Sequence, residues 1–128
     1  MVLDSNVWGP HYWFVLLSIA ICYPIHPNDV TKKKYYELIH NFPLFMPDSR
    51  IGNKFSELLD KYPVTPYLDS RDSFIKWVHF IHNRVNKMTG KNEISFFTWV
   101  IYFLKPALRP GCLLSFLFPA ETAPPGGL

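Results

Sequence analysis

The sequence predicts an all-α protein, and three observations lead to this expectation. Apolar residues recur at helical spacing in five segments, and no segment alternates apolar and polar residues as a half-buried strand does. Prolines, glycines and helix-capping residues separate these segments by short connections. The chain has 128 residues, 48% of them hydrophobic and 17% aromatic, which is enough for one domain with a modest core. A small helical bundle is the expected architecture.

The first expected helix covers residues 7–23 and is apolar on nearly every side, which predicts a central position in the bundle. Residues 4–6 offer its cap, Pro10 lies in its first turn and Pro24 ends it. Its most hydrophobic run, residues 12–23, is too short for a membrane span of roughly 20 residues. We therefore expect no membrane span, and the missing basic start and cleavage site predict no secretory signal peptide.

The second and third expected helices each carry one apolar stripe. Residues 27–42 begin at an Asn28 cap, and their stripe consists of Tyr35, Leu38, Ile39 and Phe42. Residues 47–62 carry Ile51, Phe55, Leu58, Leu59 and Tyr62 on one face. Gly52 lies inside this helix and costs about 1 kcal/mol relative to alanine unless another group packs close to it. Residues 63–66 are expected to form an extended connection.

The fourth expected helix, residues 70–88, starts at Asp69 or Ser70 and stops at Thr89 and Gly90. Its predicted buried stripe consists of Phe74, Trp77, Val78, Ile81, Val85 and Met88. The fifth expected helix, residues 92–104, begins at an Asn92 cap. These helices make residues 1–105 one expected domain.

Residues 106–128 are expected to form an irregular C-terminal arm, because five prolines and three glycines interrupt regular structure there. The segment 111–119 is too apolar to remain exposed, which predicts that it docks on this domain or on a neighbouring protein. A tail without a functional role is the alternative.

Polar side chains share one face of the fourth helix. His79, His82, Asn83 and Asn86 follow each other at i, i+3, i+4 and i+7, with Lys87 and Lys91 at the C-terminal end. Amides and an imidazole followed by cations match a ligand with heteroatom edges and an anionic end, such as a nucleotide. Three alternatives stay open: a solvated face, a core histidine bonded to a backbone group, and a metal-binding histidine pair. The pair lacks cysteine or carboxylate partners, so no metal site is predicted.

Charge and cysteine content limit the possible functions further. The net charge is +3 and the pI is about 8.9, which is less basic than a nucleic-acid-binding surface, so no nucleic-acid partner is predicted. A run of lysines at 32–34 is interpreted as a solvated face, with an anionic partner as the alternative. Cys22 and Cys112 are the only cysteines, and they form no C-x-x-C pair. Cys22 is expected at a buried helix end.

The stretch HNRVNKMTGK, residues 82–91, resembles the H-N-x-V-N-x-x-x-G-K signature of the ERV/ALR family, the small FAD-linked sulfhydryl oxidases. WGPHYWFVLLSIAICYP, residues 8–24, is similar to the first helix of that family, and residues 62–86 to its connection into the fourth helix. The resemblance covers residues 8–104. It implies a four-helix bundle with a short fifth helix, which binds FAD and forms a homodimer.

The resemblance also implies where FAD would lie, between the first and fourth helices. Gly9 and Trp13 would wall the isoalloxazine side. The fourth helix would line the cofactor with Trp77, His82, Asn83 and Asn86, and Lys87 and Lys91 would lie near phosphate. Aromatic faces stack on flat rings and ammonium groups pair with pyrophosphate, so these residue types suit the cofactor.

The chain departs from the family at the redox motif P-C-x-x-C-R-x-H-F, which aligns with PDSRIGNKF, residues 47–55. Asp48 and Ile51 occupy the two cysteine positions, Gly52 replaces the arginine, and Leu17 replaces a histidine of the first helix. Dithiol oxidation requires two sulfur atoms, one to exchange with substrate and one to pass on electrons. No catalytic residue is therefore predicted.

Two hypotheses follow. The first is a flavoprotein of the thiol oxidoreductase family, which either is active by an unorthodox route or is a degenerate pseudoenzyme that still binds FAD. The second is a non-catalytic structural or interaction protein, such as a virion component, that reuses the bundle and contacts its neighbours through residues 111–119. The missing C-x-x-C and the small size resemble the viral branch of the family, which implies a location in the virion or the host cytoplasm.

Overall fold

The computed structural model describes residues 2–106, which contain five α-helices, two short 3₁₀ helices and no β-strand. The helices are α1 (Ser5–Ile21), α2 (Asp29–Asn41), α3 (Ser49–Lys61), α4 (Arg71–Met88) and α5 (Phe96–Leu104). The 3₁₀ helices are η1 (Phe42–Phe45) and η2 (Thr65–Asp69). The all-α prediction is confirmed.

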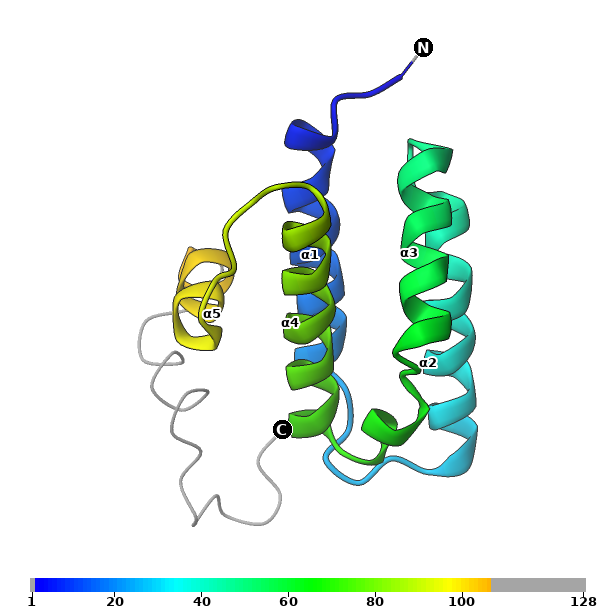
Figure 1. Ribbon diagram of the computed structural model, residues 1–128. Coiled ribbons are helices and arrows are strands. Elements are labelled where there is room, and N and C mark those ends of the chain that lie inside the picture. The colour runs from blue at the N-terminus through cyan, green and yellow to red at the C-terminus, as the bar shows by residue number, and fades with distance from the viewer. Residues whose placement is uncertain (1, 107–128) are drawn as a thin grey trace. The chain divides into compact units, whose positions relative to one another are not determined.

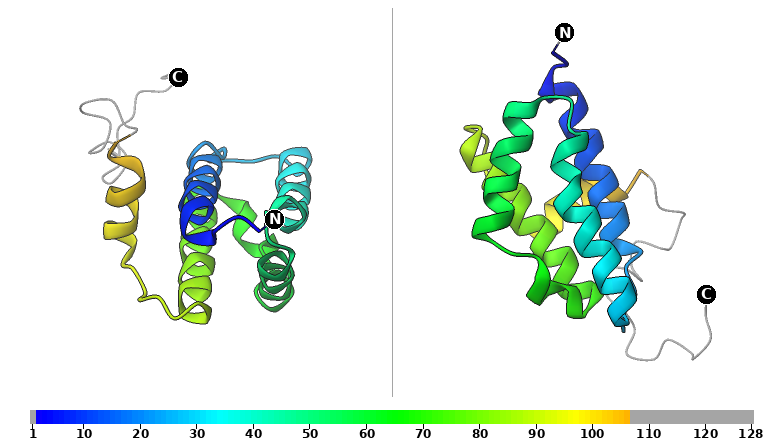
Figure 2. Two further views of the ribbon diagram at one scale, coloured as in Figure 1. Left: turned by 90° about the horizontal axis from the view of Figure 1, so that it is seen from above. Right: turned by 90° about the vertical axis from the view of Figure 1, so that its right-hand side faces the viewer.

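Helices α1 to α4 run alternately down and up and form a four-helix bundle (Figure 1). Seen from above, α1 lies beside α4 and α2 lies beside α3 (left panel of Figure 2), and α1 packs directly on α4. This first compact unit ends at Ile94, and a second unit begins at Ser95 with α5. The predicted arm, with segment 111–119 and Cys112, lies outside the described residues, so the boundary at residue 105 stays a prediction.

Each α-helix begins at a side chain that accepts a hydrogen bond from a backbone N–H of the first turn. The five caps are Asp4, Asn28, Asp48, Ser70 and Ser95. The predicted caps of α2 and α4 are confirmed, and Asp4 lies in the segment predicted to cap α1. The prediction for α5 is wrong by one turn, because Ser95 rather than Asn92 is its cap. Gly90, at a φ of 75°, ends α4 in the left-handed region that glycine tolerates.

The core of the bundle consists of apolar side chains from α1 and α4 that meet residues of the other elements. Completely buried members include Leu17, Ala20, Ile39, Val64, Phe74 and Ile81. The central position predicted for α1 is wrong, because Val7 and Val15 are 64% and 48% exposed. A helix at the corner of a four-helix bundle always keeps an outer face, whatever its composition. Cys22, predicted to be buried, is also exposed.

Two predicted apolar stripes are wider than the buried faces. Leu38 of α2 is 39% exposed, and Met88, the last residue of α4, is 46% exposed. The extended connection predicted for residues 63–66 is likewise wrong, since η2 begins at Thr65. Pro66 lies in the first turn of η2, where its fixed φ favours a helical turn and its missing N–H costs no hydrogen bond.

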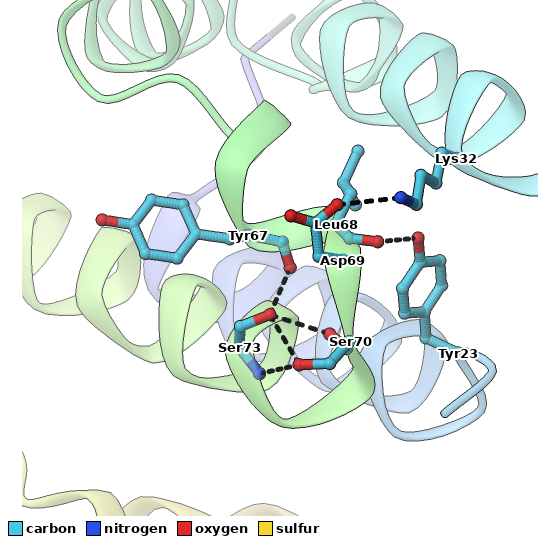
Figure 3. Close-up of polar contacts among 7 residues, drawn as sticks. All are labelled: Tyr23, Lys32, Tyr67, Leu68, Asp69, Ser70 and Ser73. Carbon is cyan, nitrogen blue, oxygen red and sulfur yellow. Dashed lines mark hydrogen bonds and ion pairs between the residues drawn. The ribbon is translucent and has the colours of Figure 1, made fainter. Parts of the chain in front are cut away.

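Side chains from α2, from α4 and from the segment after α1 hold η2 in place by hydrogen bonds (Figure 3). The hydroxyl of Tyr23, which follows α1, donates to the carbonyl of Leu68, and the ammonium of Lys32 on α2 lies 2.8 Å from the carboxylate of Asp69. On α4, the hydroxyl of Ser73 donates to the carbonyl of Tyr67 at 2.8 Å. Burial raises the pKa of Tyr23, so its hydroxyl stays a donor.

Another group packs close to Gly52, as is required if a glycine inside a helix is to have a packing role. A Cβ atom at this position would lie 2.6 Å from the carbonyl oxygen of Pro43, which is closer than real Cβ contacts. The missing side chain therefore allows η1 to pack on the first turns of α3.

Candidate functional site

The centre of the candidate site is a stacked pair of rings between α1 and α4. The rings of Trp13 and His82 lie 4.0 Å apart between centroids and are inclined by only 12°. Phe55 of α3 lies near this pair, with its ring centroid 6.1 Å from that of Trp13. Three helices thus supply flat apolar faces at one place in the bundle.

Burial fixes the charge state of His82, which is only 6% exposed. Its pKa falls to about 3, chiefly because burial disfavours the imidazolium, and also because of the nearby charges of His79 and Lys91. His82 is therefore neutral near pH 7. A solvated face, one of the alternatives left open for these polar side chains, is wrong for His82 and for Asn86, which is 5% exposed. Part of the polar face of α4 therefore lies in the interior.

Asn83 connects α4 to the segment that follows it. Its amide nitrogen donates to the carbonyl of Ile94 at 2.9 Å, and its amide oxygen accepts from the N–H of Ile94, also at 2.9 Å. The Nε2 atom of His79 lies 2.7 Å from the same carbonyl. Asn83 therefore binds both backbone groups of Ile94 and fixes the path of the chain after Gly90.

Asn86 and the two lysines lie at the C-terminal end of α4. The amide of Asn86 donates to the side-chain oxygen of Asn83 at 3.4 Å, and its backbone carbonyl accepts from the N–H of Lys91 at 2.8 Å. Lys87 and Lys91 are exposed. The predicted polar residues are thus close together, but Asn86 lies inside and the cations lie outside.

Two predicted site residues, Trp77 and Gly9, belong neither to the Trp13–His82 stack nor to the hydrogen bond between the amides of α4. Trp77 is 2% exposed, and its indole N–H donates to the carbonyl of Tyr62 at 3.1 Å, near the end of α3. Gly9 is half-buried in α1, and a Cβ atom there would meet no atom of the described residues within 4 Å. Gly9 is thus not required by tight packing within this unit.

The segment that the sequence resemblance aligns with a redox motif, residues 47–55, contains the cap and the first turns of α3. Asp48 caps this helix by accepting from the N–H of Arg50, and the guanidinium of Arg50 binds its carboxylate at 3.2 and 2.9 Å. Hydrogen bonds from the Arg50 side chain lower the pKa of Asp48, so this carboxylate remains charged. Ile51 is half-buried, and Leu17 is completely buried. Asp48 and Leu17 therefore have structural roles as helix cap and core residue.

Sequence reasoning missed an aromatic wall beside the stacked pair. Tyr12 contacts Phe42 at 5.7 Å between centroids, Phe42 contacts Phe55 at 6.2 Å, and the Tyr12 hydroxyl donates to the carbonyl of Phe45 at 2.7 Å. The i, i+4 spacing of Trp8 and Tyr12, whose rings lie 5.0 Å apart, is a signal that could have identified the part on α1.

The chemistry of the donor set fits a flavin nucleotide. Flat rings, a buried amide and a neutral imidazole suit an uncharged heteroaromatic ring, whereas the exposed ammonium groups of Lys87 and Lys91 suit phosphate. No group of three or more His, Cys, Asp or Glu side chains among the described residues could hold a metal ion. Within residues 2–106, no helix has the length and apolar character needed to cross a membrane.

Fold and site together define a helical-bundle protein with stacked rings between its first and fourth helices and two amide side chains on the fourth. The Erv1 / Alr family model matches residues 10–103, and the chain belongs to this family. The resemblance identified in the sequence is thereby confirmed.

The relatives of this chain include viral and cellular proteins. It is 33% identical over 95 residues to a probable FAD-linked sulfhydryl oxidase of Acanthamoeba polyphaga mimivirus, a match that covers 73% of this chain and 66% of the relative. It is 33% identical over 88 residues to an FAD-linked sulfhydryl oxidase of African swine fever virus, covering 69% and 72% of the two chains. A mitochondrial FAD-linked sulfhydryl oxidase of Schizosaccharomyces pombe is 28% identical over 96 residues, and the chain spans only 53% of its length.

The fold agrees with solved structures of the family. The crystal structure of the yeast Erv1 core superimposes with a TM-score of 0.71 at 24% identity, covering 81% of this chain and 86% of the other. The FAD-binding domain of Erv1 from Saccharomyces cerevisiae also gives a TM-score of 0.71, covering 80% and 96%. The predicted ERV/ALR-like bundle is therefore confirmed.

Proposed function

We propose that this chain is an FAD-binding member of the Erv1/Alr family that no longer oxidises dithiols at the first turn of α3. The stacked Trp13–His82 pair beside buried Asn86 carries the proposal, because these groups offer a nucleotide aromatic faces and an amide inside the bundle. Several relatives bear the name FAD-linked sulfhydryl oxidase, which supports FAD as the cofactor.

The residues of the chain divide the binding task among themselves. Trp13 and His82 would offer flat faces to a bound ring, and His82 would bring no charge to it because its pKa is about 3. Asn86 would supply hydrogen bonds, and Lys91 would attract phosphate. When bound, FAD would supply a two-electron acceptor.

The loss of dithiol chemistry follows from the side chains at the first turn of α3. A carboxylate at position 48 and an alkyl group at position 51 have no disulfide state, so neither can exchange with a substrate thiol. Cys22 cannot replace them within the bundle, because it follows the end of α1. This end of α1 and the beginning of α3 lie at opposite ends of the bundle (Figure 1). The chain is thus a degenerate thiol oxidoreductase in this proposal.

Visible absorbance tests whether the chain binds FAD. The chain is purified without added cofactor, and its visible spectrum is recorded before and after denaturation. We expect a flavin band that denaturation releases as FAD. Lys91→Gln should weaken FAD binding about tenfold if a charge-assisted bond to phosphate is lost. Lys33→Gln, on the exposed side of α2, should leave it unchanged.

A colourless protein that also fails to take up added FAD would overturn the cofactor proposal. Equal weakening by Lys91→Gln and Lys33→Gln would argue against the α4 end as the phosphate site. Oxygen consumption with dithiothreitol tests whether dithiol oxidation is lost. A rate above that of free FAD would contradict the loss of dithiol chemistry, and its persistence in Cys22→Ser would exclude that thiol as the source.

A non-catalytic structural role is the second candidate, favoured by exposed apolar side chains. Leu44 and Phe45 of η1 are 79% and 72% exposed, and large apolar residues at a surface mark contacts with other proteins. In this proposal the chain forms a homodimer or binds virion neighbours, with segment 111–119 as a further contact, and acts in the virion or the host cytoplasm. Light scattering of the purified chain tests the dimer, and a monomer at all concentrations would contradict it.

A further inference from the structure

A cavity of about 440 Å³ lies where the end of α3, η2 and the first half of α4 meet. Four aromatic residues line it, namely Tyr62, Tyr67, Trp77 and Phe80. Its volume falls in the lower part of the range typical of small-molecule sites, roughly 300–1,000 Å³. All its lining residues belong to the first compact unit.

The walls of this cavity are held by contacts between α3 and α4. The indole N–H of Trp77 donates to the carbonyl of Tyr62 at 3.1 Å, and Trp77 itself is 2% exposed. The ring of Phe80 stands edge-on to that of Tyr62, at 5.0 Å between centroids and an angle of 82°. Pro63 and Pro66 also line the cavity and stiffen the connection between the two helices. The aromatic faces are therefore preformed.

The charged lining residues are all cations. Lys61 comes from α3 and Lys76 from α4, and no carboxylate is among the lining residues. Asp72, outside the cavity, holds the Lys76 ammonium at 2.7 Å, and both side chains are mainly exposed. Asp72 thus compensates the charge of Lys76. The guanidinium of Arg84, however, lies 5.1 Å from the ring centroids of both Tyr62 and Phe80, so this side keeps the positive charges of Lys61 and Arg84. This arrangement complements an anion attached to an apolar group.

We propose that the cavity binds a small aromatic anion, a single ring that bears a phosphate or carboxylate group. The ring would lie against the exposed parts of Tyr67 and Phe80, with Trp77 beneath, and the anionic group would face Lys61 and Lys76. Aromatic rings favour offset or edge-on contact with another ring, and long lysine side chains can line an apolar wall while their ammonium groups stay in water.

This site is distinct from the proposed FAD site in its residues. None of the cavity-lining side chains belongs to the Trp13–His82 pair or to the polar groups at the C-terminal end of α4. The proposal therefore goes beyond the proposed function, and each can fail without the other.

Phenyl phosphate is the probe, and the full chain as purified is the sample. Its binding is followed by ¹H–¹⁵N spectra through the indole N–H signal of Trp77, which Trp77→Phe assigns. Benzyl alcohol supplies a ring without the charge, and inorganic phosphate supplies the charge without a ring. We expect saturable shifts with phenyl phosphate at concentrations at which neither comparison compound saturates the site.

Variants test the cationic and aromatic walls separately. Lys61→Gln and Lys76→Gln should each raise the Kd for phenyl phosphate about threefold, the effect of an exposed ion pair. Phe80→Leu should raise it by removing a ring from the wall. Lys33→Gln is the matched control on α2 and should leave the Kd unchanged. Circular dichroism establishes that each variant is folded.

Four outcomes would overturn the proposal. Inorganic phosphate that shifts Trp77 as strongly as phenyl phosphate would reduce the site to an ion contact. Benzyl alcohol that binds equally well would show that charge is irrelevant. Displacement of phenyl phosphate by FAD would make the cavity part of the flavin site. No shift with any of the probes would refute binding altogether, whether or not the protein carries FAD.

Discussion

At the scale of single residues, the site depends on side chains whose surroundings fix their state. His82 is neutral because it is buried against Trp13, and Asp48 is charged because Arg50 binds it. On α4, the polar residues that share one face by their spacing also differ in environment, because His82 and Asn86 are buried whereas Lys87 is exposed.

His82 should make stability depend on pH. Its folded-state pKa of about 3 lies below the ordinary value of 6.5, so between these values the unfolded chain binds more protons than the folded one. Its contribution is fully present above pH 6.5 and is lost as the pH falls toward 3. We expect a slope of up to about 1.4 kcal/mol per pH unit in this window. Urea unfolding at pH 7, 6 and 5 measures it.

His82→Phe is the matched variant, since it keeps a ring on Trp13 and removes the titration. The difference between the two profiles isolates His82 from the carboxylates that titrate in the same range. Parallel profiles would contradict the assignment.

Gly52 should not tolerate a methyl group. In Gly52→Ala the new Cβ would lie 2.6 Å from the Pro43 carbonyl oxygen, so the backbone of η1 or α3 must shift. We expect a loss of about 1–3 kcal/mol in the free energy of unfolding, as for other overpacked sites. Gly9→Ala is the control, because a Cβ there meets no described atom within 4 Å, and it should gain about 0.5–1 kcal/mol. Equal effects of the two changes in chemical unfolding would refute the packing argument.

At the scale of elements, connections are fixed by single polar side chains that meet backbone groups. Asn83 binds Ile94 after α4, and Tyr23 binds Leu68 in η2. Each satisfies backbone groups that lie outside regular hydrogen-bond ladders, so a short connection acquires a defined path.

Tyr23 should contribute more to the attachment of η2 than the ion pair beside it. Tyr23→Phe leaves the buried hydrogen bond to Leu68 unmade and should cost about 1–2 kcal/mol of unfolding free energy. Asp69→Asn removes the charge from an exposed pair, since the Asp69 side chain is 73% exposed, and should cost less. Thermal and urea unfolding of both variants test this order, and the reverse order would contradict it.

At the scale of the whole molecule, the bundle has the fold of the Erv1 core, and the first turn of α3 carries an acidic cap at Asp48. Aromatic side chains from α1 and α3 and an imidazole from α4 meet at one place only when the bundle is assembled. The cavity at the end of α3 depends on the same assembly.

The double variant Asp48→Cys with Ile51→Cys should restore a C-x-x-C at the first turn of α3. If the bundle holds FAD, this variant should oxidise dithiothreitol with oxygen consumption above that of the unchanged chain, because two sulfur atoms can then cycle between thiol and disulfide. It should also be less stable, since it loses the Asp48 cap. The control is Asp48→Cys alone, which has one sulfur and should gain no activity. A loaded but inactive double variant would show that more than the dithiol has changed.

The sequence by itself determined the helical class, the order of the helices and the family. Hydrophobic periodicity and capping residues are local, so Asn28, Ser70 and Gly90 could be identified as helix ends without a structure. For Gly52 the sequence indicated only that a glycine inside a helix is costly unless another group packs close to it, and the structure identifies that group as the Pro43 carbonyl.

Only the tertiary structure decided which polar groups are buried and which rings meet. The pairs Trp13–His82 and Trp77–Tyr62 join residues 69 and 15 positions apart, and no periodicity along one helix encodes such contacts. The same holds for Met88, whose place in the stripe is periodic but whose neighbours are missing at the helix end. Burial depends on what other segments bring to a side chain, and this is set by the packing of the whole bundle.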